Sequence, residues 1–577
     1  MRRHRSIRSA IAGAALAALL ACGPASASKT QESVIQDDPL LLSAKNQEDV
    51  DVAFRSLAAV GVDRVRVSVF WELVAPGRLS QDKPRFPGAG AASPDSYPRA
   101  GWAPYDRIAL AAQKTGVGLL FSVTGPGPAW ATPGARCAKA GPFAGCQEGV
   151  FRPNPEDFRS FVQATATRYS GTYTLEATPP PKRGGFDLPE LGGIMLDSPP
   201  APVQPGTVLP RVDHWSVWNE PNYPAWLLPI WRRNRPRTKR DMVGAAPAHY
   251  RELVDAAYAA FDATGHGGDT ILIGETSPRG DKRPRHLDGP MPPAEFAREL
   301  YCLDHRRAPF RGKAARLRGC PVSASERRAF AKRHPGLFRA QGWAHHPYSL
   351  AGGRWHLPTW RHPLRDNVPI SNLRHLTTTL DRAAARWGRR GARKSIWITE
   401  YGYQTTPPDP TAGVSPARQG PLSAWGEYLA YRNPRVASIA QFLLIDDQPV
   451  AGLPAQNRRR WVTWQSGLFT TALEPKPFFN GYRAPLHVVQ RGRNARAFGT
   501  FRPARPGAAL RASVEFARGG GKWRVLRSAK VTNPRGYVVL GFRVPRAGRV
   551  RLLYTDPATG GGVATDPARV VKRGRSG

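Results

Sequence analysis

Acidic residues are scarce in this sequence of 577 residues, and basic residues are abundant. Only 43 Asp and Glu stand against 84 Lys and Arg, which gives a formal net charge of +41 at pH 7. Such a balance first suggests nucleic acid. However, the basic residues are scattered along the chain and nowhere interleave with aromatics as a base-stacking platform, so we expect no nucleic-acid binding. A solvated basic surface is the simplest interpretation, and attraction to an anionic cell-wall polymer or acidic polysaccharide is the functional alternative.

Long apolar runs are also missing, so the sequence predicts no transmembrane segment. The one apolar run near the amino terminus, Ser9–Ala21, is too short to span a bilayer and follows four arginines. Ala25–Ala27 then offers a small-residue cleavage site, so residues 1–27 are typical of a secretory signal peptide. A second interpretation stays open. Leu19–Cys22 fits a loose lipobox, which would leave a secreted protein anchored at the cell surface through a lipid on Cys22.

Cysteine is rare, with five residues in the chain. Apart from Cys22 they form two local pairs, Cys137 with Cys146 and Cys302 with Cys320. Neither pair has a further cysteine nearby, so we predict two loop-stapling disulfides rather than metal sites. No other His or carboxylate cluster has ligand spacing, and we expect no metal.

From residue 34 to 490, short β-rich runs alternate with amphipathic helical stretches. This alternation indicates a parallel sheet with helices packed outside it, and eight such units fit a (β/α)₈ barrel with insertions. A doubly wound open sheet is the alternative, but no Gly-rich phosphate turn follows the early strands. The expected strands are Val34–Leu42, Val62–Phe70, Gly118–Thr124, Val212–Trp218, Thr270–Gly274, Gly342–His346, Lys394–Thr399 and Ala437–Ile445.

After residue 492 the helical periodicity ends. Four short β-type runs with turns between them predict a small all-β, sandwich-like domain over 492–577. A packing or spacer role is favoured over carbohydrate binding for this domain.

Two glutamates stand directly after expected strands. Glu220 lies in Trp218-Asn219-Glu220-Pro221-Asn222 after the fourth strand, and Glu400 lies in Thr399-Glu400-Tyr401-Gly402 after the seventh. Barrel enzymes place catalytic groups at these carboxyl ends, so the two side chains are expected to face one cleft. Cleavage of a glycosidic bond needs such a pair, one carboxyl protonated and the other ionised.

The combination resembles the large clan of retaining (β/α)₈-barrel glycosidases, clan A, that includes families 5 and 39. The chain looks most similar to bacterial family 39-like and cellulase-like secreted proteins over about residues 45–490. The clan's acid/base is a Glu preceded by Asn after the fourth strand, and its nucleophile is a Glu after the seventh. The resemblance therefore implies that Glu220 is the acid/base and Glu400 the nucleophile.

Other positions match the clan's pattern. The resemblance implies that Arg66 hydrogen-bonds and charge-pairs with the nucleophile, and that Asn219 binds the sugar 2-hydroxyl. His346 and Tyr348, in His345-His346-Pro347-Tyr348, resemble the clan's cleft residues, with Tyr348 close to the nucleophile. Trp130 resembles a sugar-stacking position.

The eighth strand departs from the clan, because it lacks the Trp that often lies under the reacting sugar. Trp461 or Trp464, in the following loop, is the candidate replacement. Glu275, which ends the fifth strand, is a third carboxylate within reach. It either helps to position the substrate or caps the next segment, and the capping role is favoured.

The sequence thus predicts a retaining glycoside hydrolase that cleaves β-type O-glycosidic bonds of a polysaccharide or oligosaccharide without a cofactor. The alternatives are a non-catalytic saccharide-binding cell-wall protein on the same barrel and a structural wall protein held by its basic surface.

Overall fold

The structure is a computed structural model that describes residues 28–571, apart from 136, 139–144, 147, 177–203, 235–241, 283–285, 350–356, 411, 505–509 and 557–558. The expected signal peptide and Cys22 lie outside the described residues. Within them, no helix combines the length and apolar character needed to cross a membrane.

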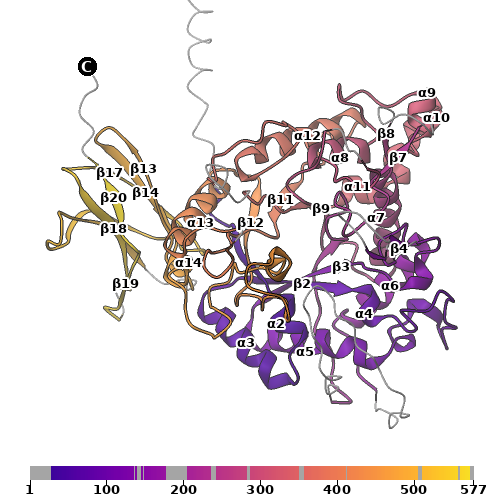
Figure 1. Cartoon of the computed structure of the whole chain (residues 1–577), viewed down its shortest axis with the longest axis horizontal. Coiled ribbons are helices and arrows are strands. Elements are labelled where there is room, and N and C mark those ends of the chain that lie inside the picture. The colour runs from indigo at the N-terminus through magenta and orange to yellow at the C-terminus, as the bar shows by residue number, and fades with distance from the viewer. Residues whose placement is uncertain are drawn as a thin grey trace, which may run out of the picture.

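Eight parallel strands close into a barrel, in the order β1-β12-β11-β10-β9-β6-β3-β2. The prediction of a (β/α)₈ barrel with a carboxyl-terminal all-β region is confirmed (Figure 1). The strands are β1 (Glu32–Gln36), β2 (Arg64–Phe70), β3 (Gly118–Thr124), β6 (His214–Val217), β9 (Thr270–Thr276), β10 (Gly342–His345), β11 (Ser395–Ile398) and β12 (Val436–Phe442).

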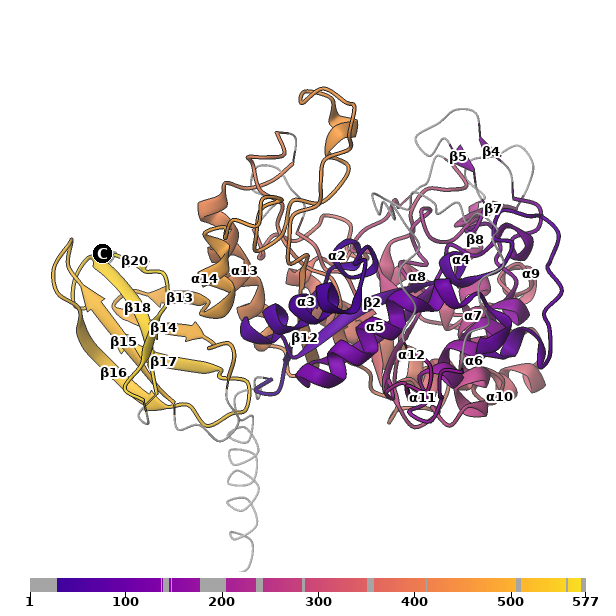
Figure 2. The same ribbon diagram turned by 90° about the horizontal axis from the view of Figure 1, so that it is seen from below.

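Helices follow the strands and cover the barrel from outside (Figures 1 and 2). Their buried faces match the apolar spacing in the sequence, as expected for amphipathic elements. The main helices are α3 (Gln47–Ala59), α5 (Arg99–Thr115), α6 (Pro155–Arg168), α7 (Ala246–Ala263), α8 (Pro293–Leu300), α12 (Leu373–Arg386) and α13 (Pro416–Tyr431). Shorter ones are α2 (Asp38–Leu42), α4 (Trp71–Val74), α9 (Gly312–Arg316), α10 (Ala324–Arg333), α11 (Pro335–Arg339) and α14 (Phe478–Arg483).

The first expected strand, Val34–Leu42, is wrong beyond Gln36. Asp37 is the N-cap of α2, where its side chain accepts a hydrogen bond from the Leu40 backbone N–H, and Pro39 lies in the first turn. An Asp cap followed by Pro is a strong helix start, and here it outweighs the β-type Leu run.

Cys302 and Cys320 form a disulfide whose Cα atoms are 5.5 Å apart. Cys137 and Cys146 lie opposite each other in the two-residue ladder of β4 (Cys137–Ala138) and β5 (Gly145–Cys146). The side chains of this second pair lie outside the described residues, and its disulfide stays a prediction.

Two antiparallel sheets follow the barrel and enclose their own apolar core. One sheet has the order β13-β14-β17, with β13 (Leu486–Arg491), β14 (Asn494–Gly499) and β17 (Val538–Arg543). The other combines β15 (Arg511–Ala517), β16 (Arg524–Lys530), β18 (Gly548–Thr555), β19 (Gly562–Ala564) and β20 (Ala568–Val570).

The carboxyl-terminal sheets pack beside α13 and α14 (Figure 1). Arg502 forms a buried ion pair with Glu427 of α13, and Arg535 pairs with Glu32 and Asp63 at the amino-terminal ends of β1 and β2. These contacts lie away from the carboxyl ends of the strands, which are left free to form a cavity.

Candidate active site

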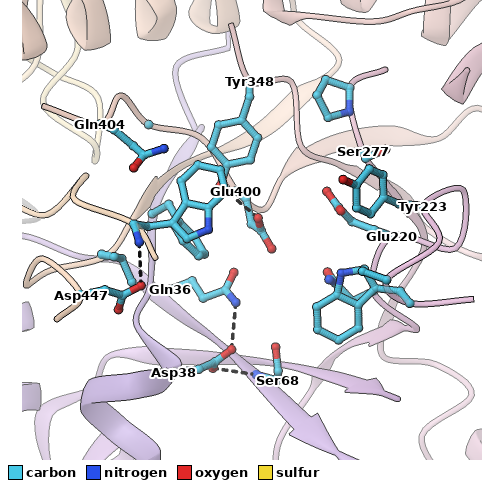
Figure 3. A pocket seen from close by; sticks show the side chains of 18 of the residues that line it. Gln36, Asp38, Ser68, Glu220, Tyr223, Ser277, Tyr348, Glu400, Gln404 and Asp447 are labelled. Atoms are coloured by element: carbon cyan, nitrogen blue, oxygen red, sulfur yellow. Dashed lines mark hydrogen bonds between the residues drawn. The ribbon is translucent and has the colours of Figure 1, made fainter. Parts of the chain in front are cut away.

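A cavity of about 620 Å³ opens at the carboxyl end of the barrel. Its floor and walls come from the ends of most barrel strands and from the loops that follow them. This is where (β/α)₈ barrels place their functional groups. The polar side chains that line it include Gln36, Asp38, Ser68, Asn219, Glu220, Tyr223, Ser277, Tyr348, Glu400, Gln404 and Asp447 (Figure 3).

Glu220 and Glu400 enter this cavity from β6 and β11. The chain turns sharply after β6, where Trp218 has φ +61° and Glu220 has φ +36°. Such left-handed conformations are costly for residues with a Cβ, and they persist only where the surroundings enforce them. The Glu220 N–H donates to the Glu275 carbonyl at 3.0 Å, which holds the turn and fixes where the Glu220 side chain begins.

The two carboxyl groups meet at His346, which follows β10. His346 Nδ1 lies 2.9 Å from Glu220 Oε1 and 3.5 Å from Glu400 Oε2. One oxygen of each glutamate and a His346 ring nitrogen all lie within 4.8 Å of one another. The structure therefore brings together three of the predicted site residues.

Arg66, on β2, lies beneath the pair and is fully buried. Its Nη1 is 3.3 Å from Glu400 Oε1, and its Nη2 donates to Asn219 Oδ1 at 2.8 Å. Its Nε and Nη2 donate to the two oxygens of Glu275 at 3.0 and 2.6 Å. Glu275 thus holds the guanidinium in place and does not line the cavity, a contact that the sequence analysis did not foresee.

The surroundings make the two glutamates electrostatically unequal. Burial and the charge of Glu400 raise the pKa of Glu220 well above its usual range, with Arg66 opposing the rise. Burial also raises the pKa of Glu400, to about 7, whereas Arg66 and the Tyr348 hydroxyl act to lower it. Because Arg66 touches Glu400, a proton shared by the pair resides preferentially on Glu220.

His346 and Tyr348 interact differently with Glu220 and Glu400. Burial and the positive charge of Arg66 lower the pKa of His346 well below its usual range, so its ring is neutral at pH 7. Tyr348 donates its hydroxyl to Glu400 Oε2 at 3.0 Å. The preceding His345 has a different role, because its ring is held by Thr276 and the Val368 carbonyl.

An aromatic wall lies on the Glu400 side of the cavity. Trp464 stacks on Tyr348, with ring centroids 5.3 Å apart and planes at 28°, and meets Phe442 edge-on at 5.4 Å. Of the two tryptophans proposed for the missing eighth-strand Trp, Trp464 lines the cavity and Trp461 does not.

The structure does not bring Trp130 to the cavity, which corrects the sugar-stacking expectation. Its ring is buried, packs against Trp71 at 5.9 Å and Phe86 at 5.8 Å, and donates Nε1–H to the Pro76 carbonyl. The large aromatic surface is better buried behind β2 and β3 than exposed in the cleft.

Several polar residues of the cavity escaped the sequence interpretation, among them Gln36, Asp38 and Asp447. Gln36 is the last residue of β1 and Asp38 follows the strand, and their position was hidden because the first strand was expected to continue to Leu42. Asp447 lies in the loop that follows β12. A polar Gln-Asp-Asp run at the end of the first β-type segment was the signal that could have revealed two of them.

Glu220, His346 and Glu400 are also the one group among the described residues with the spacing of a metal site. The guanidinium of Arg66 already supplies positive charge 3.3 Å from Glu400 Oε1. The arrangement therefore fits a proton-sharing carboxyl pair better than a metal centre.

The closed barrel and the opposed glutamates define the class: a (β/α)₈-barrel protein with paired carboxylates after its fourth and seventh strands. No protein-family model matches the sequence, and no curated protein is similar to it in sequence.

Solved structures are similar in fold alone. A β-glucuronidase of Parabacteroides merdae is 10% identical over 94% of this chain and 49% of its own, with a TM-score of 0.35. The chain thus spans about half the length of that protein. A family 5 glycoside hydrolase of Bacteroides vulgatus is 11% identical over 91% and 90% of the two chains, with a TM-score of 0.38. An aphid myrosinase is 12% identical over 76% and 86%, with a TM-score of 0.40. Superpositions this loose carry no conclusion about the reaction, which is inferred below from the site.

Proposed function

We propose that the protein is a retaining glycoside hydrolase that cleaves O-glycosidic bonds of the β type in a polysaccharide or oligosaccharide. The observation that carries this proposal is the facing pair Glu220 and Glu400, whose nearest oxygens lie within 4.8 Å in the cavity at the carboxyl end of the barrel. Retaining enzymes hold their two carboxyl groups about 5–5.5 Å apart, and inverting ones about 6.5–9.5 Å apart. The short separation supports retention.

The roles follow from the contacts. Glu220, which is protonated, gives its proton to the glycosidic oxygen as the bond to the leaving group breaks. Glu400, stabilised as a carboxylate by Arg66 and Tyr348, attacks the anomeric carbon and forms a covalent glycosyl-enzyme. Glu220 then takes a proton from water, the water oxygen attacks the same carbon, and Glu400 is released.

Asn219 and Trp464 support this assignment as binding groups. Asn219 Oδ1 is occupied by Arg66, so its Nδ2 remains to donate to a sugar hydroxyl such as the 2-hydroxyl. Trp464 offers an aromatic face beside Glu400, and sugar rings present C–H faces that suit such a wall.

The test is release of reducing sugar from a panel of polysaccharides and aryl glycosides. We expect release by the wild type, a fall of about 10²–10⁴-fold for Glu220→Gln, and loss for Glu400→Gln. Azide should rescue Glu400→Ala and leave an azide adduct of inverted configuration. Glu156→Gln, at an exposed site on α6, is the matched control. Tight saccharide binding without release by the wild type would overturn the proposal in favour of a saccharide-binding wall protein.

We also propose that the chain is exported. The basic and apolar amino-terminal segment supports this, as does the Cys302–Cys320 disulfide, because such bonds persist in oxidising compartments. The mass of the mature amino terminus distinguishes cleavage after Ala27 from a lipid on Cys22. Attachment to an anionic wall polymer through the basic surface predicts binding that weakens as salt is raised.

A further inference from the structure

Asp38 is a buried carboxylate that lines the cavity but has no part in the proposed chemistry. Its Oδ1 accepts the Ser68 N–H at 3.0 Å, and its Oδ2 accepts Gln36 Nε2 at 2.9 Å (Figure 3). A carboxylate can accept about four hydrogen bonds, so these two leave about two for a ligand in the cavity.

The neighbouring residue holds Asp38 rigidly in this position. Asp37 accepts hydrogen bonds from the backbone N–H groups of Leu40, Leu444 and Ile445 at 2.9–3.1 Å. These bonds tie the start of α2 to the end of β12, so the backbone that carries Asp38 is fixed from two sides. Such preorganisation is typical of binding residues.

Asp38 is also connected to the nucleophile. Gln36, which donates to Asp38, accepts a hydrogen bond from Arg66 Nη1 through its own Oε1, and the same Nη1 lies 3.3 Å from Glu400. One amide and one guanidinium therefore set the position of Asp38 relative to Glu400. A sugar whose anomeric carbon faces Glu400 would present its ring hydroxyls to this network.

A second carboxylate, Asp447, lies in the same half of the cavity. Its Oδ2 accepts the Trp464 N–H at 3.0 Å, which sets it beside the aromatic wall. In Figure 3 Asp38, Gln36 and Asp447 lie on the side of Glu400 away from Glu220, whereas Tyr223 and Ser277 lie beside Glu220. The sugar attacked by Glu400 would therefore lie in the half of the cavity with Asp38 and Asp447. The leaving group would lie in the half beside Glu220.

The charge of the cavity contrasts with that of the chain. The protein carries a formal charge of +41, yet four Asp and Glu side chains line the cavity. Among the described lining residues Arg279 is the one Lys or Arg, and it follows Ser277 on the leaving-group side. Arg66 is occupied by Glu275, Asn219, Gln36 and Glu400. A negatively charged sugar beside Glu400 would therefore meet Asp38 and Asp447, and the described part of the lining offers it no available positive charge there.

We propose that Asp38 and Asp447 accept hydrogen bonds from hydroxyl groups of the sugar that Glu400 attacks, so that this position takes a neutral sugar and rejects a uronic acid. The inference rests on the proposed function and names the substrate class of the same site. Like charges at such short range are repulsive, whereas hydroxyl donors match the free acceptor positions.

The first test needs no variant. The wild type is assayed on 4-nitrophenyl β-glycosides of glucose, galactose, mannose and xylose and on the glucuronide. We expect kcat/KM for the best neutral glycoside to exceed that for the glucuronide by at least about 100-fold. Equal or faster cleavage of the glucuronide would overturn this inference and leave the hydrolase intact. Absence of cleavage of every compound and polysaccharide would overturn both.

The second test identifies the hydroxyls. Versions of the best glycoside that each lack one ring hydroxyl are compared on wild type, Asp38→Asn and Asp447→Asn. Loss of a hydroxyl that Asp38 accepts should lower kcat/KM about 10- to 100-fold in the wild type and much less in Asp38→Asn, with other hydroxyls unaffected by the substitution. Asp447→Asn should show the same pattern for a different hydroxyl.

The control is Asp262→Asn, which removes a carboxylate paired with Arg339 at an exposed site on α7. It should reproduce the wild-type losses for every deoxy compound. A purely structural role of Asp38 would lower activity on all compounds by the same factor, and that uniform loss would contradict the proposal.

Discussion

At the scale of single residues, Arg66 is what gives two identical carboxyl groups different roles. It is fully buried, and its charge is balanced by Glu275. Glu275 also accepts a hydrogen bond from the Ser122 hydroxyl at 2.8 Å. Removal of either partner would leave an unpaired buried charge, which is strongly destabilising. The pair is therefore both a structural element of the barrel and the source of the field that favours the carboxylate at Glu400.

Tyr348 should tune the pH dependence of activity. Activity requires ionised Glu400, whose pKa is about 7, so kcat/KM falls as the pH drops through that value. The Tyr348 hydroxyl stabilises the carboxylate, and Tyr348→Phe should therefore raise this pKa and move the acid limb to higher pH by about 0.5–1 unit. The alkaline limb reports loss of the proton from Glu220 and should move less.

The measurement is the pH profile of kcat/KM. Tyr97→Phe is the control, because the Tyr97 hydroxyl bonds the Ala91 carbonyl outside the site. An acid limb that stays in place in Tyr348→Phe, or that moves to lower pH, would show that the hydroxyl does not act on the titrating group.

At the scale of elements, the segment between β12 and α14 is the part of the barrel that shapes the aromatic wall. It carries Asp447 and Trp464 and is closed by a buried ion pair in which Lys476 Nζ lies 2.9 and 3.0 Å from the oxygens of Asp446. Asp446 also accepts the Gly467 N–H at 2.7 Å, and Lys476 donates to the Gln465 carbonyl at 3.1 Å. The ion pair therefore determines where Trp464 lies.

Breaking this ion pair on one side should affect both stability and binding. Lys476→Met leaves Asp446 buried without its partner and should lower the free energy of unfolding by about 3–5 kcal/mol. It should also raise KM, because Trp464 loses its support. In the double variant Asp446→Leu/Lys476→Met no charge is left unpaired, and most of the stability should return.

Urea unfolding and steady-state kinetics check both effects. Arg55→Met, which breaks the exposed pair with Glu48 on α3, is the control and should change neither quantity. If Lys476→Met and the double variant are equally unstable, the unpaired charge is not the cause.

At the scale of the whole molecule, the barrel and the carboxyl-terminal sheets are joined by buried polar contacts. Arg502 pairs with Glu427 and donates to the Tyr482 carbonyl at 2.7 Å, and the Tyr537 hydroxyl donates to Glu427 at 3.0 Å. Figure 2 shows the sheets at one end of the long axis, next to α13 and α14. These contacts suit the packing role expected for the region.

The two parts should therefore unfold together. Calorimetry of the wild type should show one cooperative transition. Arg502→Met, which leaves Glu427 buried and unpaired, should cost about 3–5 kcal/mol and separate the transition into two.

Arg551→Met is the control, since its partner Glu515 lies within the carboxyl-terminal sheet rather than at the interface. That variant should keep a single transition. Two separate transitions in the wild type itself would contradict the coupling.

The sequence by itself determined the barrel and the two glutamates. Short runs rich in β-branched and aromatic residues indicate strands, and β2 and β3 were predicted from such runs almost to the residue. Glu220 and Glu400 were found because each directly follows such a run, and the carboxyl ends of parallel strands meet at one edge.

Only the tertiary structure decided which other side chains join the glutamates. Trp130 and Trp464 both follow strands, yet one is enclosed by Trp71 and Phe86 and the other lies in the cavity. Asp38 was hidden inside an expected strand, and its place depends on Ser68 and Leu444, which are distant in sequence. The periodicity of apolar residues indicates which face of a helix or strand is buried. It does not indicate which other segment covers that face, because this depends on packing across the whole barrel.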